Sequence, residues 1–299
     1  MYMEKLREYF LATRPYSFPA TFAPIFIGSS FSLFYIEKFN FINFTLFLLI
    51  CLLIQAGTNL FNEYYDYKSG LDKIDSQGIA GSIVKNKLSA KEVFMEAVLL
   101  YCIAFILGVI LSFYTSMYLL LVGSICMLVG YIYTGGKYPI AYSPFGEIVS
   151  GFFMGTMIIV ISYYLQTSFI NLDVLIISIP MFILIGNMLM ANSIRDLDND
   201  KVSGRKTFAI IVGKNRAIKV MAFSYLLVYI LSLLFVLIKY ASFYNLLIFL
   251  TIPLAINIIA GLKNNITKEK MAPYMILSAQ LTIAYGLLTS LAYILNYII

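Results

Sequence analysis

Long apolar stretches separated by short polar connections dominate this sequence. Runs of about 18 or more apolar residues are long enough to cross a lipid bilayer as helices. The pattern therefore predicts an all-α membrane protein with about nine spans, and no long soluble segment remains between them. We expect one integral-membrane domain over residues 1–299. The predicted spans cover residues 17–36, 41–59, 93–114, 116–133, 147–165, 173–191, 218–238, 243–261 and 272–297.

The composition agrees with a bilayer location and suggests an orientation. Hydrophobic residues make up 61% of the chain and charged residues only 12%, whereas soluble domains are about 25% charged. If the N-terminus lies in the cytoplasm, all of the 21 basic residues except Lys38 and Lys239 fall on the cytoplasmic side. This bias is the usual topology signal of membrane proteins. It also accounts for the net charge of +6 without a nucleic-acid partner.

Other features of the sequence limit the chemistry. The chain has no histidine, which excludes histidine bases and histidine metal ligands. The three cysteines, Cys51, Cys102 and Cys126, lie inside apolar spans, and we expect no disulfide. The segment Met1–Thr13 mixes charged and apolar residues as a helix at the inner membrane surface would. We expect no cleaved signal peptide, because the first span contains Pro19 and Pro24 and leads into eight more.

Only two connections are long and polar, and they match each other. They cover residues 60–92 and 192–217, both on the predicted cytoplasmic side, and each begins with Asn-x-x-x-Asp followed by a further acid. The match suggests a duplicated unit in parallel orientation, although two separately evolved acidic loops remain an alternative. The residues are Asn62, Asp66 and Asp72 in the first loop and Asn192, Asp196 and Asp200 in the second.

Polar residues also enter the second span on one side. Gln55, Asn59, Asn62 and Asp66 follow one another at intervals of four, three and four, so they share one stripe of a helix. Polar groups in lipid need partners inside the protein, so the stripe should face a cavity or another helix. Gln55 is as readily explained as a contact that joins helices.

The two loops together are typical of a site for Mg²⁺ and a diphosphate. Carboxylates near lipid are costly and mark functional sites, and Mg²⁺ takes oxygen ligands shared between carboxylates and substrate phosphates. Two sets of acids with amides beside them suit two Mg²⁺ ions on one diphosphate. The neighbouring bases could bind the remaining phosphate oxygens. These bases are Lys68 and Lys73 in the first loop and Arg195, Lys201, Arg205 and Lys206 in the second.

At these residues the chain resembles the UbiA-type intramembrane prenyltransferases. The stretches Asn59–Asp72 and Asn192–Thr207 resemble the family's two aspartate-rich motifs, and Thr13-Arg14-Pro15 resembles its N-terminal signature. The resemblance covers nearly the whole chain. Within the family, the sequence is most similar to the 1,4-dihydroxy-2-naphthoate polyprenyltransferases of menaquinone synthesis. This similarity rests on the spacing of Asp66 and Asp72 and on the segment Tyr133–Glu147. One departure is Tyr16, where many members carry histidine.

The resemblance implies a nine-helix bundle and an Mg²⁺-dependent transfer of a polyprenyl group from its diphosphate to an aromatic acceptor. The acceptor it implies is 1,4-dihydroxy-2-naphthoate, with loss of carbon dioxide, in the cell membrane and with the site facing the cytoplasm. Asp66, Asp72, Asp196 and Asp200 would be catalytic, and with Asn62 and Asn192 they would hold the metal. The substrate-binding residues would be Arg14, Asn59, Asn62, Lys68, Asn192, Arg195, Arg205, Lys206, Tyr133 and Tyr138.

Two alternatives stay open at the level of sequence. The same family could act on another acceptor, such as 4-hydroxybenzoate. A cation-coupled transporter could use the carboxylates as its ion site, although such sites usually lie near the membrane midplane. Prenyl length and oligomeric state are not determined by these patterns.

Overall fold

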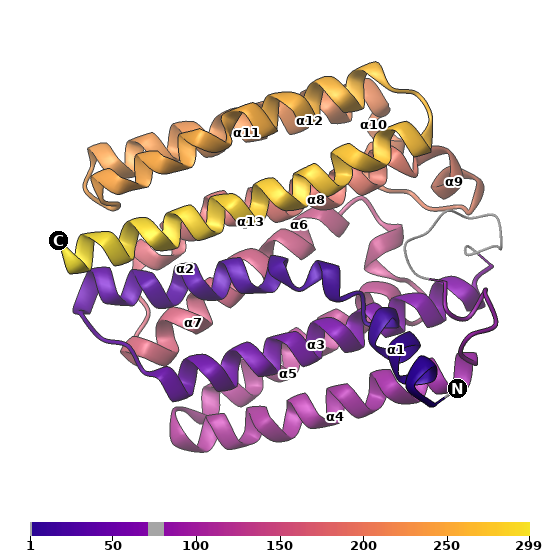
Figure 1. The fold of residues 1–299 in the computed structure, drawn as a ribbon, viewed down its shortest axis with the longest axis horizontal. Helices are drawn as coiled ribbons and strands as arrows, with labels where there is room; N and C mark the ends of the chain where they lie inside the picture. Colours follow the sequence, from indigo (N-terminus) through magenta and orange to yellow (C-terminus); the bar gives the residue numbers. More distant parts are fainter. Residues whose placement is uncertain (1, 71–80) are drawn as a thin grey trace. The chain divides into compact units, whose positions relative to one another are not determined.

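The computed structural model describes residues 2–70 and 81–299, and every regular element in this part of the chain is a helix. Eight helices are long and apolar enough to span a membrane, and Ala20–Ile36 is a shorter apolar helix. The prediction of an all-α membrane protein with about nine spans is confirmed. The elements are α1 Tyr2–Ala12, η1 Pro15–Ser17, α2 Pro19–Ile36, α3 Phe41–Lys68, α4 Ala90–Tyr114, α5 Met117–Thr134, η2 Ile140–Tyr142, α6 Gly146–Ser150, η3 Gly151–Met157, α7 Ile158–Thr167, α8 Leu172–Arg195, α9 Leu197–Val202, α10 Phe208–Val212, α11 Lys214–Leu237, η4 Phe243–Thr251, α12 Ile252–Asn264 and α13 Lys268–Ile298 (Figure 1).

Two elements depart from the regular helix that apolar length alone predicts. Residues Gly151–Met157 form a π-helical segment between α6 and α7, and Phe243–Thr251 form a 3₁₀ helix before α12. The helix that carries the first motif is also longer than predicted, because α3 continues to Lys68. Its polar stripe keeps helical spacing, so the helix can leave the apolar region without a break.

The chain forms two compact units. The first comprises Met1–Thr21 and Thr45–Ile140, and it contains α1, most of α3, α4 and α5. Its core includes Leu60, Phe61 and Val93. The Tyr101 side chain from α4 lies so close to two glycines that a Cβ on either would clash with it: its ring lies against Gly57 of α3, and its hydroxyl lies against Gly130 of α5. Tyr101 therefore joins three helices of this unit.

Helix α1 is attached to the first unit through ion pairs. Lys5 Nζ lies 2.5 Å from Glu92 Oε1 at the start of α4, and Lys87 Nζ lies 2.6 Å from Glu8 Oε1. Met3 and Phe10 are exposed on the same helix. The predicted N-terminal helix is thus present, and its place at the membrane surface remains a prediction.

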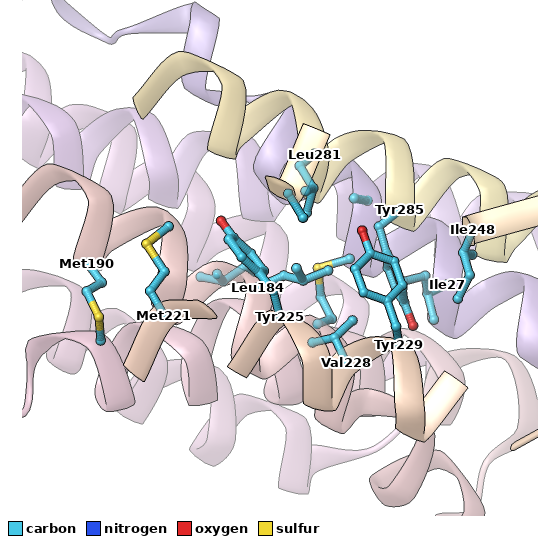
Figure 2. Close-up of a cluster of buried hydrophobic side chains, with 14 of the residues drawn as sticks. Ile27, Leu184, Met190, Met221, Tyr225, Val228, Tyr229, Ile248, Leu281 and Tyr285 are labelled. Carbon is cyan, nitrogen blue, oxygen red and sulfur yellow. The ribbon is translucent and has the colours of Figure 1, made fainter. Parts of the chain in front are cut away.

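The second unit comprises Phe22–Phe44 and Ala141–Ile299, and α8 is its central helix. Helix α8 contacts the π-helical segment, α11 and α13, and Met181, Leu184 and Ile185 are essentially fully buried. Figure 2 shows part of this core between α8, α11 and α13. Because α8 carries the second motif at its end, the packing of this core positions that motif.

Hydroxyl pairs stabilise the same core. Tyr225 and Ser278 form a hydrogen bond of 3.0 Å between α11 and α13, and Ser232 and Tyr285 form one of 2.6 Å between the same helices. Buried polar groups need internal partners where water is absent. These pairs therefore join α13 to α11 along its length.

Candidate active site

The inner part of the α3 stripe binds the N-terminal signature segment. Gln55 Nε2 donates to the carbonyl of Ser17 at 2.9 Å, and Asn59 Nδ2 donates to the carbonyl of Thr13 at 2.9 Å. The stripe was predicted to face a cavity or another helix. Its inner part contacts the segment between α1 and α2, and Gln55 joins structural segments. Asn59, predicted to bind substrate, has this backbone contact in the described structure.

These contacts hold Arg14 in an unusual conformation. Its φ is 56°, in the left-handed region that non-glycine residues rarely adopt. Its Nε atom is buried and has no hydrogen-bond partner among the described residues. Local strain of this kind is concentrated at functional sites. Arg14 thus lies between Thr13 and Ser17, whose carbonyls are both hydrogen-bonded to α3.

The outer part of the stripe carries the first motif. Asn62 is partly buried, and its Oδ1 atom is enclosed without a hydrogen-bond partner in the part of the chain that the structure describes. Asp66 lies one helical turn further and is also partly buried. The Lys68 ammonium lies 5.8 Å from the centre of the Tyr64 ring. Asp72, Lys73 and Asp75 lie outside the described residues.

The second motif lies at the end of α8 and in α9. Asp196 ends α8 and begins α9, and its carbonyl accepts the backbone N–H of Asp200 at 2.9 Å. One helical turn therefore separates these two acids. Asn192 lies one turn before Asp196, and its Oδ1 is buried with no hydrogen-bond partner among the described residues. Asp198, which lies between Asp196 and Asp200, is exposed.

The two acids of this motif differ in electrostatics. Burial of Asp196 by itself would raise its pKa, but hydrogen bonds and charge from Arg195 and Lys268 outweigh burial and hold the pKa below its usual value. For Asp200, burial dominates and raises the pKa to about 6, with Arg205 opposing the shift. Arg205 Nη1 lies 3.2 Å from Asp200 Oδ1. Both carboxyls have basic partners close by.

The connection before α6 packs against this motif. The Arg205 guanidinium lies 4.6 Å from the centre of the Tyr142 ring, and the Lys206 backbone N–H donates to the Tyr142 carbonyl at 2.8 Å. Arg205 is held between a carboxylate and an aromatic ring, whereas the Lys206 side chain is exposed. Two segments that are far apart in sequence therefore form one structure in the second unit.

The aromatic candidates in the first unit have different surroundings. Tyr133 is partly buried near the end of α5. Tyr138 is 81% exposed, with the Lys137 ammonium 5.5 Å from its ring centre. Closer to the first motif, the hydroxyls of Tyr65 and Tyr131 form a hydrogen bond of 2.6 Å. The roles predicted for Tyr133 and Tyr138 remain predictions.

Sequence reasoning missed three residues around the motifs. Glu63 is fully buried, and its Oε1 accepts the Ile83 backbone N–H at 3.2 Å. This hydrogen bond joins the segment before α4 to α3. Glu147 is 7% exposed and accepts a hydrogen bond of 3.0 Å from Ser193 within the second motif. Lys268 contacts Asp196 from α13. The sequence could have indicated Glu147, because an acid at the start of an apolar span is unusual. Nothing in the sequence around Lys268 indicated its contact with Asp196.

The donor atoms of both motifs fit a hard cation. Within residues 2–70 and 81–299, no three histidine, cysteine, aspartate or glutamate side chains form a metal-binding group by themselves. Each motif nevertheless has a buried amide oxygen without a partner, on Asn62 and Asn192, one turn before an aspartate. A buried acceptor without a partner costs about 1–3 kcal/mol, and amide and carboxylate oxygens are ligands that Mg²⁺ accepts.

Comparison with known proteins identifies relatives of the whole chain. The model of the UbiA prenyltransferase family matches residues 21–294. The chain is 40% identical to a 1,4-dihydroxy-2-naphthoate octaprenyltransferase of Bacillus subtilis, over 95% of this chain and 91% of that protein. It is 28% identical to the enzyme of the same name from Haemophilus influenzae, over 71% of each chain.

The fold also matches solved structures. A UbiA homolog from Archaeoglobus fulgidus, bound to DMAPP and Mg²⁺, superposes with a TM-score of 0.65 at 18% identity, covering 94% of this chain and 98% of that one. A UbiA homolog from Aeropyrum pernix gives a TM-score of 0.70 at 15% identity, covering 91% and 96%. At this identity the likeness establishes the fold.

Proposed function

The chain belongs to the UbiA prenyltransferase family, and we propose that it transfers a polyprenyl group from polyprenyl diphosphate to 1,4-dihydroxy-2-naphthoate. The carboxylate of the acceptor leaves as carbon dioxide, and the immediate product is the hydroquinone (quinol) form of a demethylmenaquinone. Support for this acceptor comes from the Bacillus subtilis relative, a 1,4-dihydroxy-2-naphthoate octaprenyltransferase that aligns along 95% of the chain. The spacing of Asp66 and Asp72 and the segment Tyr133–Glu147, on which the resemblance to this subgroup rests, agree with it.

The observation that carries the proposed chemistry is the pair of equivalent amide oxygens on Asn62 and Asn192. We propose that these oxygens and the carboxylates of Asp66, Asp72, Asp196 and Asp200 hold Mg²⁺ with the diphosphate of the donor. When bound, Mg²⁺ neutralises the diphosphate and makes it a better leaving group. The archaeal homolog with DMAPP and Mg²⁺ gives a precedent for both ligands in this fold.

The protein's bases supply the remaining recognition of the donor. Arg14, Lys68, Arg195, Arg205 and Lys206 offer charged N–H donors, and such donors bind phosphate oxygens strongly. The bond between the diphosphate oxygen and the allylic carbon breaks with its electron pair on the diphosphate. The developing allylic cation is stabilised by the negative charge of the diphosphate, which these bases hold in place.

The acceptor supplies its own nucleophile in this scheme. The ring carbon that bears the carboxylate attacks the allylic carbon, and the bond to the carboxylate then breaks and returns its electron pair to the ring. No proton leaves the ring at this carbon. A histidine base is therefore unnecessary, which suits a chain that has no histidine. We further propose that the site faces the cytoplasm, where the distribution of basic residues puts both motifs.

A comparison of acceptors tests the proposed function. Purified protein with polyprenyl diphosphate and Mg²⁺ is expected to prenylate 1,4-dihydroxy-2-naphthoate and to release one carbon dioxide per product, measured by mass spectrometry and labelled carboxylate. 4-Hydroxybenzoate is the matched aromatic control. Product from 4-hydroxybenzoate alone would contradict the proposed acceptor and leave prenyl transfer intact. If neither acceptor gave a product, both the proposed acceptor and the proposed prenyl transfer would be contradicted.

Basic residues after Asp200 should affect the donor selectively. Lys206→Ala is expected to raise the KM for polyprenyl diphosphate about tenfold and to leave the acceptor KM unchanged, because one charged contact to phosphate is lost. Arg205→Ala should also lower kcat, because Arg205 additionally contacts Asp200 and Tyr142. Lys219→Ala is the control, since Lys219 is exposed on α11 and is not among the bases proposed to bind phosphate. Equal changes for donor and acceptor would point to loop ordering instead.

A further inference from the structure

The N-terminus of α13 brings a base to the second motif from a distant part of the chain. Lys268 is the first residue of α13, and its Nζ lies 3.0 Å from Asp196 Oδ1. Arg195 donates to both oxygens of the same carboxylate, through Nε to Oδ1 and through Nη2 to Oδ2. The Lys268 and Asp196 side chains are 22% and 21% exposed, so water can still reach the pair. A side chain of α13, Met275, also contacts Arg195, which fixes this helix beside the end of α8.

The position of Lys268 is unusual for a lysine. The N-terminus of a helix carries a partial positive charge, which disfavours cations in the first turn. The neighbouring Lys270 and Lys263 are exposed, as expected for bases that only mark membrane topology. The Lys268 side chain instead points toward a carboxylate of the second motif, so its positive charge lies at the proposed site.

Two bases contact the single carboxylate of Asp196. Arg195 contacts both of its oxygens, and Lys268 contacts Oδ1. This group of three side chains has two cations and one anion when Asp196 is ionised. An anionic ligand would complete it. The group is already preorganised, because each base is held by an acid before a ligand arrives.

We propose that Lys268 is a further diphosphate-binding residue, an inference that rests on the proposed prenyl transfer. In the absence of donor its ammonium pairs with Asp196. When the Asp196 carboxylate takes a metal ion, the ammonium is displaced from it. The long and flexible lysine side chain then reaches a phosphate oxygen of the donor held at the same carboxylate. Asp196 thus holds the Lys268 ammonium close to the position where it contacts the diphosphate of the donor.

Kinetics and direct binding test this assignment together. Lys268→Gln is expected to raise the KM for polyprenyl diphosphate about tenfold, since a hydrogen bond between charged groups is lost, while the acceptor KM stays within about twofold. Calorimetry with inorganic diphosphate and Mg²⁺ should show the same tenfold weakening without any turnover. Lys268→Arg should restore most of both values. Lys270→Gln is the matched control, because it removes one positive charge from the same turn of α13.

Two results would overturn the assignment. Unchanged donor KM and unchanged diphosphate affinity in Lys268→Gln would show that Lys268 does not bind the donor. Tighter Mg²⁺ binding with unchanged diphosphate affinity would show that Lys268 only competes with metal for Asp196. Either result with an active wild-type protein leaves the proposed function intact, whereas a wild-type protein without prenyl transfer contradicts the proposed function itself.

Discussion

Asp196→Asn is expected to lower turnover about 100-fold or more while the protein stays folded. The amide has nearly the shape of the carboxylate but lacks its charge, so a metal-bound diphosphate loses a preorganised electrostatic partner, and losses of this kind typically cost about 10²–10³ in kcat. Asp66→Asn should have a similar effect from the first motif. Turnover is measured in detergent across a Mg²⁺ titration, and thermal unfolding of each variant is recorded in parallel.

Asp198→Asn is the matched control for this experiment. Asp198 lies between Asp196 and Asp200 in sequence, but it is exposed, so its amide should leave activity nearly unchanged. Near-normal turnover of either Asp66→Asn or Asp196→Asn at saturating Mg²⁺ would contradict the role of both motifs in metal binding. Equal loss of activity in the Asp198 control would indicate a general charge effect.

Gly151→Leu and Gly155→Leu are expected to prevent stable folding of the second unit. A Cβ at Gly151 would lie 2.4 Å from the carbonyl oxygen of Phe182, and a Cβ at Gly155 would lie 2.9 Å from the Phe182 Cα. These contacts are with the backbone of α8, which has no side-chain freedom to move away. Overpacking of a core costs about 1–3 kcal/mol, and a backbone contact should reach the upper end of this range.

Two other glycines provide the control for these substitutions. Gly108 on α4 and Gly123 on α5 have open space where a Cβ would lie, so leucine at either position should be tolerated. Size-exclusion chromatography and thermal unfolding in detergent distinguish the two groups. Normal unfolding temperatures for Gly151→Leu would contradict the close contact between the π-helical segment and α8.

The sequence was sufficient for those features that depend on local chemistry. Long apolar runs determine membrane helices because every backbone polar group in lipid must be bonded within its own segment. The spacing of Gln55, Asn59, Asn62 and Asp66 determined that they share one face of a helix. The prediction of a UbiA-type prenyltransferase was also confirmed, because both motifs are contiguous stretches of sequence.

Helix regularity and long-range partners were decided only by the tertiary structure. Nothing in the sequence around Gly151 and Gly155 indicates a π-helical segment. Both glycines lie against the backbone of α8 near Phe182, and only the tertiary structure shows this contact.

The partners of the motif side chains follow the same rule. The role of Asn59 in substrate binding stays a prediction, and only the structure shows that its amide donates to the carbonyl of Thr13, 46 residues away. Lys268 looked like one more topology signal and lies against Asp196. Apolar periodicity and motif spacing act through neighbours along one helix, whereas these contacts depend on which helices pack together. The sequence by itself therefore determined the membrane helices, the two motifs and the class of chemistry. The tertiary structure decided which carboxylate each base meets, because that depends on packing between segments far apart in the chain.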